Sequence, residues 1–264
     1  VDRGLAGGTL APTMTLLRDY SNQARTYDET RAASPSVLAP LRAALAGAPG
    51  RRLADIGGGT GNYARALRDE GWDPVVVDRE PAMLAHAAGK GLETVEGDAQ
   101  RLPLADVSVD AVMLVSMLHH VEDPAAALAE AQRVLRPGGR LALMVFTRED
   151  TEESWLSDYF PSTRAWMLET HATRAELLAL LPGARQIEVV YRDLEDGSLA
   201  ALSAYPEKLV DPAWHRQTSY FERLQRDHPD ELRAGLARLR ADVDAGRAPR
   251  RPGLASVLAW TKPA

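Results

Sequence analysis

Short apolar runs alternate with amphipathic stretches through the middle of the chain, between residues 51 and 146. The apolar runs have the length of buried strands and occupy residues 52–56, 74–77, 92–96, 109–115 and 141–146. The stretches between them have helical spacing and occupy residues 62–70, 81–88 and 124–135. Alternation of strands and helices is typical of a parallel sheet with helices on both faces, and we predict that α/β architecture here.

The pattern changes on both sides of this alternation. Upstream, residues 16–31 and 34–45 predict helices. Downstream, the sequence predicts a capped helix at 173–181, strands at 185–194 and 253–263, and a charge-rich helical stretch between those strands. The segment LRPGG at 135–139 predicts a helix stop followed by a turn.

These elements predict one domain over residues 1–264. Residues 14–48 would form an N-terminal helical arm, and the core sheet would come from residues 51–194 and 253–261. Residues 197–250 would form a helical insertion, or cap, packed over one edge of the sheet.

The sequence LADIGGGTGNYA follows the first predicted strand and places four glycines within five positions. Glycine allows positive φ angles and a close approach of backbone to a ligand, so this turn predicts a nucleotide-like ligand. Gly59, Gly61 and the alanine three residues on fit the dinucleotide pattern G-x-G-x-x-A, with Asp78 near the distance expected for an acid that binds ribose. Asp55, just before the glycines, belongs to a different pattern.

Charge favours one of these two interpretations. NAD would place an anionic pyrophosphate at the turn, and a carboxylate at Asp55 would repel it. S-adenosylmethionine would bring a sulfonium and an ammonium group, for which that carboxylate is a favourable partner. We therefore expect a cationic ligand beside Asp55, Gly57, Gly59 and Gly61, and keep an NAD(P)-dependent oxidoreductase as the alternative.

Composition narrows the function classes further. The chain has no cysteine, which excludes disulfides, thiolate zinc sites and cysteine nucleophiles. Its formal net charge of −6 argues against general nucleic-acid binding, which relies on an excess of Lys and Arg. No apolar run approaches the roughly 20 residues that cross a bilayer, and the N-terminus lacks the layout of a signal peptide. We expect a cytoplasmic protein with a small-molecule substrate, no metal, and no nucleic-acid or membrane partner; pairing into a homodimer stays open.

Five stretches, in order, resemble the motifs of the class I S-adenosylmethionine-dependent methyltransferases. They are LADIGGGTG, VVVDRE, EGDAQRLPL, DAVMLVSMLHHVED and RVLRPGGRLALMVF. The resemblance covers residues 14–194 and 253–261. Within the family it is closest to the small-molecule branch, which includes quinone-biosynthesis and natural-product enzymes. It implies a Rossmann-like sheet of seven strands whose last strand runs antiparallel.

The resemblance also implies roles for residues of the cofactor site. Asp78 would accept hydrogen bonds from both ribose hydroxyls, and Asp98 would face the adenine amino group. Ala99 would offer a backbone N–H, and Ser116 would lie beside the methionine part of the cofactor.

Residues outside the motifs are candidates for the walls of the site. In the N-terminal arm, Arg31 would meet the cofactor carboxylate, and Tyr27 or Tyr20 would wall the pocket. Substrate-pocket candidates after the fifth strand are Trp155, Tyr159 and Trp166.

His119 and His120 are the candidate general bases, in the loop where family members meet both cofactor and substrate. An ordinary pKa of about 6.5 suits proton removal at neutral pH, although only a weakly acidic hydroxyl or a carbon acceptor needs a base. The predicted reaction is in-line methyl transfer to an O, C or N atom of a small, moderately apolar metabolite, aromatic acceptors included. A nucleic-acid methyltransferase on the same fold is a further alternative.

Overall fold

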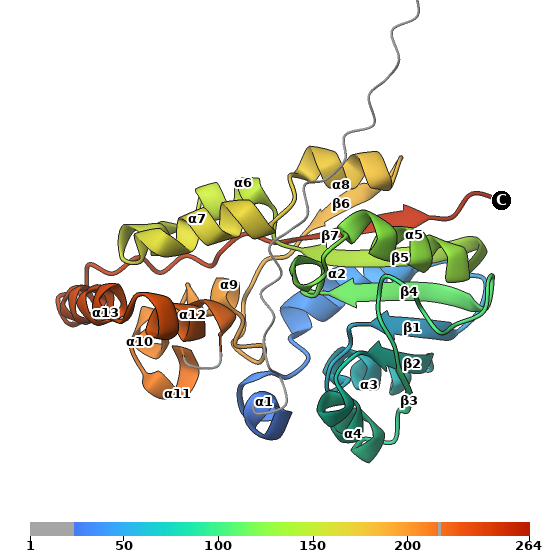
Figure 1. Cartoon of the computed structure of the whole chain (residues 1–264), viewed down its shortest axis with the longest axis horizontal. Helices are drawn as coiled ribbons and strands as arrows, with labels where there is room; N and C mark the ends of the chain where they lie inside the picture. The colour runs from blue at the N-terminus through green and yellow to red at the C-terminus, as the bar shows by residue number, and fades with distance from the viewer. Residues whose placement is uncertain (1–23, 216–217) are drawn as a thin grey trace, which may run out of the picture.

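The computed structural model describes residues 24–215 and 218–264, and at its centre lies a seven-stranded sheet (Figure 1). The strands are β1 (Arg52–Ile56), β2 (Asp73–Asp78), β3 (Glu93–Glu96), β4 (Val109–Val115), β5 (Leu135–Val145), β6 (Arg185–Glu188) and β7 (Ser256–Thr261). They lie in the order β3-β2-β1-β4-β5-β7-β6. The pairs among β1 to β5 are parallel, whereas β7 runs antiparallel to both β5 and β6. The predicted Rossmann-like sheet with an antiparallel last strand is confirmed.

Three strands differ from their predicted bounds by more than one residue at an end. β5 begins at Leu135, so the segment predicted as a turn belongs to the strand. In the pairing of β4 with β5, Val109 lies opposite Leu135 but Ala111 lies opposite Arg140. The residues of β5 between Leu135 and Arg140 therefore form a bulge. β6 and β7 are shorter than predicted.

Helices surround this sheet. They are α1 (Ala24–Thr30), α2 (Pro35–Leu45), α3 (Asn62–Arg68), α4 (Pro81–Gly89), α5 (Pro124–Val134), α6 (Arg148–Glu152), α7 (Pro161–Thr170), α8 (Arg174–Leu180), α9 (Leu199–Leu202), α10 (Pro206–Leu209), α11 (Pro212–His215), α12 (Ser219–Asp227) and α13 (Pro229–Asp244). Two 3-10 turns, η1 (Leu118–His120) and η2 (Trp155–Asp158), follow β4 and α6. Ser34 caps α2 and Thr173 caps α8, so both helices begin where a polar side chain satisfies a backbone N–H.

Alternate strand residues pack on opposite faces of the sheet, as the period of a strand requires. In β4, Val112 and Leu114 lie in the apolar core shared with α5 and α8. Ala111 and Met113 lie in the core shared with α2, α3 and α4. Both faces are therefore covered, which leaves the ends of the strands as the open edges.

A third apolar core lies outside the sheet, in a helical cap. The stretch 197–250 is helical, as predicted, but residues 155–167 contribute to the same core. The rings of Phe160 and Phe221 meet edge to face there, with centroids 5.0 Å apart. Figure 1 shows α7 and α9 to α13 gathered beside the end of the sheet where β4 finishes. The cap thus stands over the carboxyl ends of the parallel strands.

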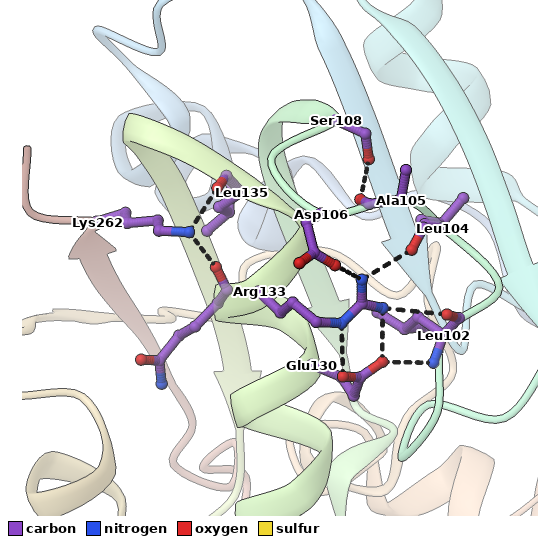
Figure 2. A network of polar contacts seen from close by, with 10 residues as sticks. Leu102, Leu104, Ala105, Asp106, Ser108, Glu130, Arg133, Leu135 and Lys262 are labelled. Carbon is purple, nitrogen blue, oxygen red and sulfur yellow. Dashed lines mark hydrogen bonds and ion pairs between the residues drawn. The ribbon is translucent and has the colours of Figure 1, made fainter.

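Arg133 of α5 donates hydrogen bonds to the loop that follows β3 (Figure 2). Its guanidinium donates to the carbonyl oxygens of Leu102 at 3.1 Å and Leu104 at 2.9 Å. Glu130 pairs with Arg133 at 2.7 Å and accepts a hydrogen bond from the Leu102 amide at 2.8 Å. Because Asp98 lies in the same loop, this network holds one of the predicted site residues in place.

Candidate active site

A groove runs over the carboxyl ends of β1, β2, β3 and β4, and we call it the strand-end groove. Its volume is about 1080 Å³ including the open mouth. The residues lining it that the sequence nominated for the cofactor are Tyr27, Gly57, Gly59, Asp78, Asp98, Ala99 and Ser116. Open α/β sheets bind ligands at this edge, so its position alone makes the groove a candidate ligand site.

Asp78 ends β2 and faces the turn that follows β1. Its Oδ2 accepts a hydrogen bond from the Gly59 amide at 2.9 Å, and its Oδ1 accepts one from the Glu80 amide at 2.9 Å. Gly59 has a φ of +56°, and a Cβ there would meet no described atom within 4 Å. Backbone donors therefore fix the carboxylate, while the space beside the glycine is open to a ligand.

The loop after β3 brings a second carboxylate to the groove. Asp98 is exposed there and accepts a hydrogen bond from the Gln100 amide at 2.8 Å. The Gln100 side chain accepts in turn from the amide of Asp123, the N-cap of α5, at 2.8 Å. Gln100 lines the groove but was not nominated, because a lone glutamine in a loop carries no motif. It ties the loop after β3 to the start of α5.

The charges along the strand-end groove are mostly negative. The carboxylates among its described lining residues are Asp78, Glu80, Asp98 and Glu122. Arg79 is the one guanidinium among them. An anionic pyrophosphate would be repelled by this lining, whereas a sulfonium or an ammonium group would be attracted to it.

Asp55 and Gly61 lie beneath the glycine turn and are not among the residues that line the groove, and their role at the cofactor stays a prediction. Asp55 is 2% exposed and lies so close to Gly58 that a Cβ at that glycine would collide with its carboxyl group. Burial, and then the charge of Asp78, raise the pKa of Asp55 to about 8. Gly61 begins α3, where a Cβ would collide with Leu92. The preference for a cationic ligand therefore comes from the groove's other carboxylates.

A second cavity, the cap cavity, lies between the end of the sheet and the helical cap and measures about 850 Å³ including its open mouth. Apolar side chains that line it include Phe146, Leu156 and Met167. Side chains with hydroxyl groups that line it include Thr151, Ser154, Ser198, Ser203, Thr218 and Ser219. Tyr27, Ser116 and His120 line both this cavity and the strand-end groove. The two spaces therefore adjoin at those three residues.

Ser116 stands at this junction in a strained conformation. Its φ is +52°, which is uncommon for a residue other than glycine. The Ser116 amide donates to the Met144 carbonyl oxygen at 3.1 Å, so the chain is still held by β5 at the point where it leaves β4. Backbone strain of this kind concentrates at ligand sites, where the surrounding structure maintains it.

The two candidate bases follow in η1. His119 and His120 both line the cap cavity, and of the two only His120 also lines the strand-end groove. Their ring centroids are 4.0 Å apart with planes inclined at 45°. The structure thus places His120 where a group of the cavity and a group of the groove would meet.

The aromatic residues nominated for the substrate pocket pack in the cap core instead. Trp155 is 4% exposed and Trp166 is 7% exposed, both within that core. Tyr159 lies against the same core and donates its hydroxyl to Asp242 of α13 at 2.9 Å. The cap needs an apolar core of its own, which large aromatic rings supply, and a contact of these three with substrate stays a prediction. Tyr20 lies outside the described residues.

Arg31 lines the cap cavity and is not among the residues that line the groove, and its contact with the cofactor carboxylate stays a prediction. Its guanidinium pairs with Asp196 at 2.9 Å, and Tyr63 donates its hydroxyl to the same carboxylate at 2.8 Å. Arg31 and Asp196 also form an isolated antiparallel bridge. Arg31 therefore joins α1 to the start of the helical insertion.

Helix α1 is also fastened to the glycine turn. Asp28 accepts a hydrogen bond from the Thr60 hydroxyl at 2.6 Å and pairs with Lys90 at 2.7 Å. Burial raises the pKa of Asp28, but hydrogen bonds from Lys90, Thr60 and Asn62 outweigh it and hold the pKa below its usual value. These contacts keep the adjacent Tyr27 at the junction of the groove and the cavity.

His171, which the sequence did not nominate, pairs with Tyr220 in the cap cavity. His171 and Tyr220 line the cavity, and the Tyr220 hydroxyl lies 2.9 Å from Nε2 of His171. They are 49 residues apart and belong to no shared motif, so a single sequence offers no signal that pairs them.

Two further features bear on the class of site. Over residues 24–215 and 218–264, no three or more His, Cys, Asp and Glu side chains are arranged to hold a metal ion. None of the helices in those ranges is both long and apolar enough to cross a bilayer.

The part of the chain that carries the strand-end groove is similar to known methyltransferases. Residues 54–143, from β1 to β5, match the family described as a methyltransferase domain. An uncharacterized methyltransferase of Mycobacterium tuberculosis is 46% identical over 105 residues, which are 39% of this chain and 43% of that protein. A demethylmenaquinone methyltransferase of Beutenbergia cavernae is 42% identical over 106 residues, which are 39% of this chain and 44% of that protein. The chain therefore matches less than half the length of these relatives.

Solved structures resemble more of the chain. A putative methyltransferase from an antibiotic biosynthesis pathway of Anabaena variabilis has a TM-score of 0.75 and 26% identity, covering 87% of this chain and 98% of that one. A phosphoethanolamine N-methyltransferase of Haemonchus contortus, in complex with S-adenosyl-L-methionine, has a TM-score of 0.60 and 18% identity. It covers 94% of this chain and 59% of that one, and shows likeness of fold.

The seven-stranded sheet, the glycine turn that is hydrogen-bonded to the acid ending β2, and the methyltransferase match over β1 to β5 agree with one another. The methyltransferase match disagrees with the oxidoreductase alternative. Residues 54–143 therefore form a methyltransferase domain, within a chain whose fold is similar to that of solved methyltransferases.

Proposed function

We propose that this protein is an S-adenosylmethionine-dependent methyltransferase, which holds its cofactor in the strand-end groove and methylates an O, C or N atom of a small molecule in the cap cavity. The observation that carries the proposal is that the two spaces adjoin at Tyr27, Ser116 and His120. A transfer between two bound molecules needs such a junction, because donor and acceptor atoms must approach within contact distance.

The residues of the groove fit the cofactor. The Asp78 carboxylate is held by two backbone donors, and each of its oxygens has a further lone pair for a ribose hydroxyl. Asp98, which lines the groove with Ala99, would take the adenine amino group. The open space beside Gly59 leaves room for the ligand that these acids would hold.

When bound, S-adenosylmethionine supplies an electrophilic methyl group on its sulfonium, and the protein supplies position and surroundings. Tyr27 and Ser116 would form the walls between the groove and the cavity and keep water from the gap. His120, at the same place, would accept the proton of an acceptor whose nucleophilic atom is a weakly acidic hydroxyl or a carbon.

The cap cavity supports a small and moderately apolar acceptor. Phe146, Leu156 and Met167 offer apolar surface, while hydroxyl groups and imidazoles around them can orient polar groups. The names of two similar proteins refer to a quinone and to an antibiotic pathway, which also favours a small-molecule acceptor. With such a substrate, we expect the protein to act in the cytoplasm.

A labelling experiment tests this proposal. Purified protein would be incubated with methyl-labelled S-adenosylmethionine and an extract of the source organism, separated beforehand into small-molecule, protein and nucleic-acid fractions. We expect label in the small-molecule fraction, and none with Asp78→Ala at the same cofactor concentration. Label found only in nucleic acid or only in protein would contradict the proposal.

A further inference from the structure

Helix α1 is held against the glycine turn of the strand-end groove by polar contacts. Asp28 accepts hydrogen bonds from the Thr60 hydroxyl at 2.6 Å and from the Asn62 side-chain amide at 2.9 Å. Asn62 also donates to the carbonyl oxygen of Arg31 at 2.6 Å, just past the end of the helix. Tyr27, in the same helix, lines the groove. A ligand that fills the groove therefore meets both α1 and the turn to which α1 is bonded.

The end of α1 is also joined to the residues that precede α9. The Gly197 amide donates to the Thr30 carbonyl oxygen at 2.7 Å, and the Ala32 amide donates to the Glu195 carbonyl oxygen at 2.8 Å. A Cβ at Gly197 would lie 2.8 Å from the same Thr30 oxygen, so a side chain there would collide with it. The two segments run antiparallel, and we call this pairing the seam.

A buried ion pair lies at the centre of the seam. Arg31 pairs with Asp196 at 2.9 Å, and the Tyr63 hydroxyl donates to the other carboxylate oxygen at 2.8 Å. Asp196 is 7% exposed, and loss of one partner of a buried pair leaves the other charge uncompensated. Asp196 is not among the residues that line the groove or the cap cavity, so it acts on both only through its partners.

A wall of the cap cavity begins directly after the seam. Ser198 caps α9 and accepts a hydrogen bond from the Ala201 amide at 3.3 Å. The residues of this stretch that line the cavity are Ser198, Leu199, Ala200 and Ser203. Helix α9 has only 4 residues, and so short a helix depends on tertiary contacts for its stability. The seam therefore helps to hold this wall in place.

We infer that Arg31 and Asp196 are positioning residues that couple the strand-end groove to the cap cavity, so that a bound cofactor strengthens binding of the methyl acceptor. A ligand in the groove stabilises α1, α1 stabilises the seam, and the seam holds α9 against the cavity. By thermodynamic linkage, the acceptor raises the affinity for the cofactor by the same factor. The inference rests on the proposed function and adds that its two sites are energetically coupled.

Hydrogen exchange with mass detection tests the coupling without an acceptor. The purified protein would be compared with and without saturating S-adenosylhomocysteine, at residues 196–203 and at α13 of the same cap. A ligand slows exchange through global unfolding everywhere, so α13 measures that share. We expect exchange at residues 196–203 to slow at least about fivefold more than exchange at α13, which is the lower end of the usual range for coupling between two sites.

Asp196→Asn is the main variant, because it keeps the size of the side chain and removes the charge of the ion pair. It should keep the protection of the glycine turn by S-adenosylhomocysteine and abolish the extra protection of residues 196–203. Asp193→Asn is the matched control, since Asp193 accepts from the Ser34 hydroxyl at 3.0 Å, outside the seam, and should keep that extra protection. A side chain that only stabilised the cap would change exchange in the free protein, and not the difference that the ligand makes.

The outcomes separate this coupling from the function on which it rests. No extra protection of residues 196–203, in protein that binds S-adenosylhomocysteine, overturns the coupling and leaves the proposed function standing. Extra protection that persists in Asp196→Asn, or that is lost equally in Asp193→Asn, overturns the role assigned to the ion pair. Failure to bind S-adenosylhomocysteine overturns the proposed function, and the coupling with it.

Discussion

The backbone amide of Gly59 donates a hydrogen bond to Oδ2 of Asp78 across 2.9 Å. This bond joins the glycine turn after β1 to the acid that ends β2, so two motifs that are separate in the sequence form one side of the strand-end groove. The same residues could have served a dinucleotide. The other carboxylates of the groove are what favour a cationic ligand.

Replacement of Asp78 by alanine should weaken binding of S-adenosylhomocysteine at least about tenfold, because a charge-assisted hydrogen bond contributes roughly 1.5–3 kcal/mol. Asp73→Ala is a matched control, since Asp73 begins the same strand and forms an exposed pair with Arg52 at 3.1 Å. Calorimetric titration of both variants checks the prediction. Unchanged affinity in Asp78→Ala would count against its role at the ribose.

Replacement of Asp28 should lower the local stability of α1. Asp28→Ala removes the contacts with Thr60 and Lys90, so amide exchange in residues 24–31 should become faster while β1 stays protected. Glu29→Gln, on the exposed neighbouring residue, is the control. Hydrogen exchange with mass detection measures both. Equal protection of α1 in the two variants would show that Asp28 does not hold the helix.

The pH dependence of stability should report on Asp55. Its pKa is 3.8 in the unfolded chain and about 8 in the folded one, so between those values the native state keeps a proton that the unfolded state has lost. The free energy of unfolding contributed by this group therefore falls as pH rises through that window.

Asp55→Asn has no such proton to lose, so the Tm of the variant relative to the parent should rise from pH 5 to pH 8. A rise of about 2 °C or more corresponds to roughly 1 kcal/mol in a chain of this size. Thermal melts without cofactor measure it. A difference that stays flat across this range would mean that Asp55 is ionised in the native protein.

The two histidines of η1 should differ in their effect on turnover. His120 lines both the strand-end groove and the cap cavity, whereas His119 lines the cap cavity but not the groove. His120→Ala should therefore lower kcat more than His119→Ala does. If the acceptor needs a base, the loss should be about a hundredfold or more. Turnover at saturating cofactor, once an acceptor is known, gives the comparison. Wild-type turnover in both variants would show that neither imidazole removes a rate-limiting proton.

The sheet and most of the groove could be predicted because their signals are local. The strand of Asp55 and the strand of Asp78 are short apolar runs bounded by turn residues, and the glycine turn between them has its own pattern. We expected Asp55 beside the ligand, whereas its side chain is buried under the glycine turn. Spacing in the sequence does not distinguish these two orientations. Only the close approach of Gly58 reveals the second arrangement.

The cap cavity could not be predicted because its residues meet only through tertiary packing. Trp155 and Trp166 had the strongest aromatic signal, yet the cap buries both in its own core. His171 had no signal, and it meets Tyr220 because α12 packs against α7. Sequence pattern identifies apolar residues reliably, but it does not identify which buried surface encloses a cavity.

We propose that the strand-end groove of this chain takes the cofactor of a methyltransferase rather than a dinucleotide. Calorimetric titration of the purified protein with S-adenosylhomocysteine, and then with NADH, tests it most directly. We predict micromolar binding of S-adenosylhomocysteine and no measurable binding of NADH. Micromolar binding of NADH alone would contradict the account.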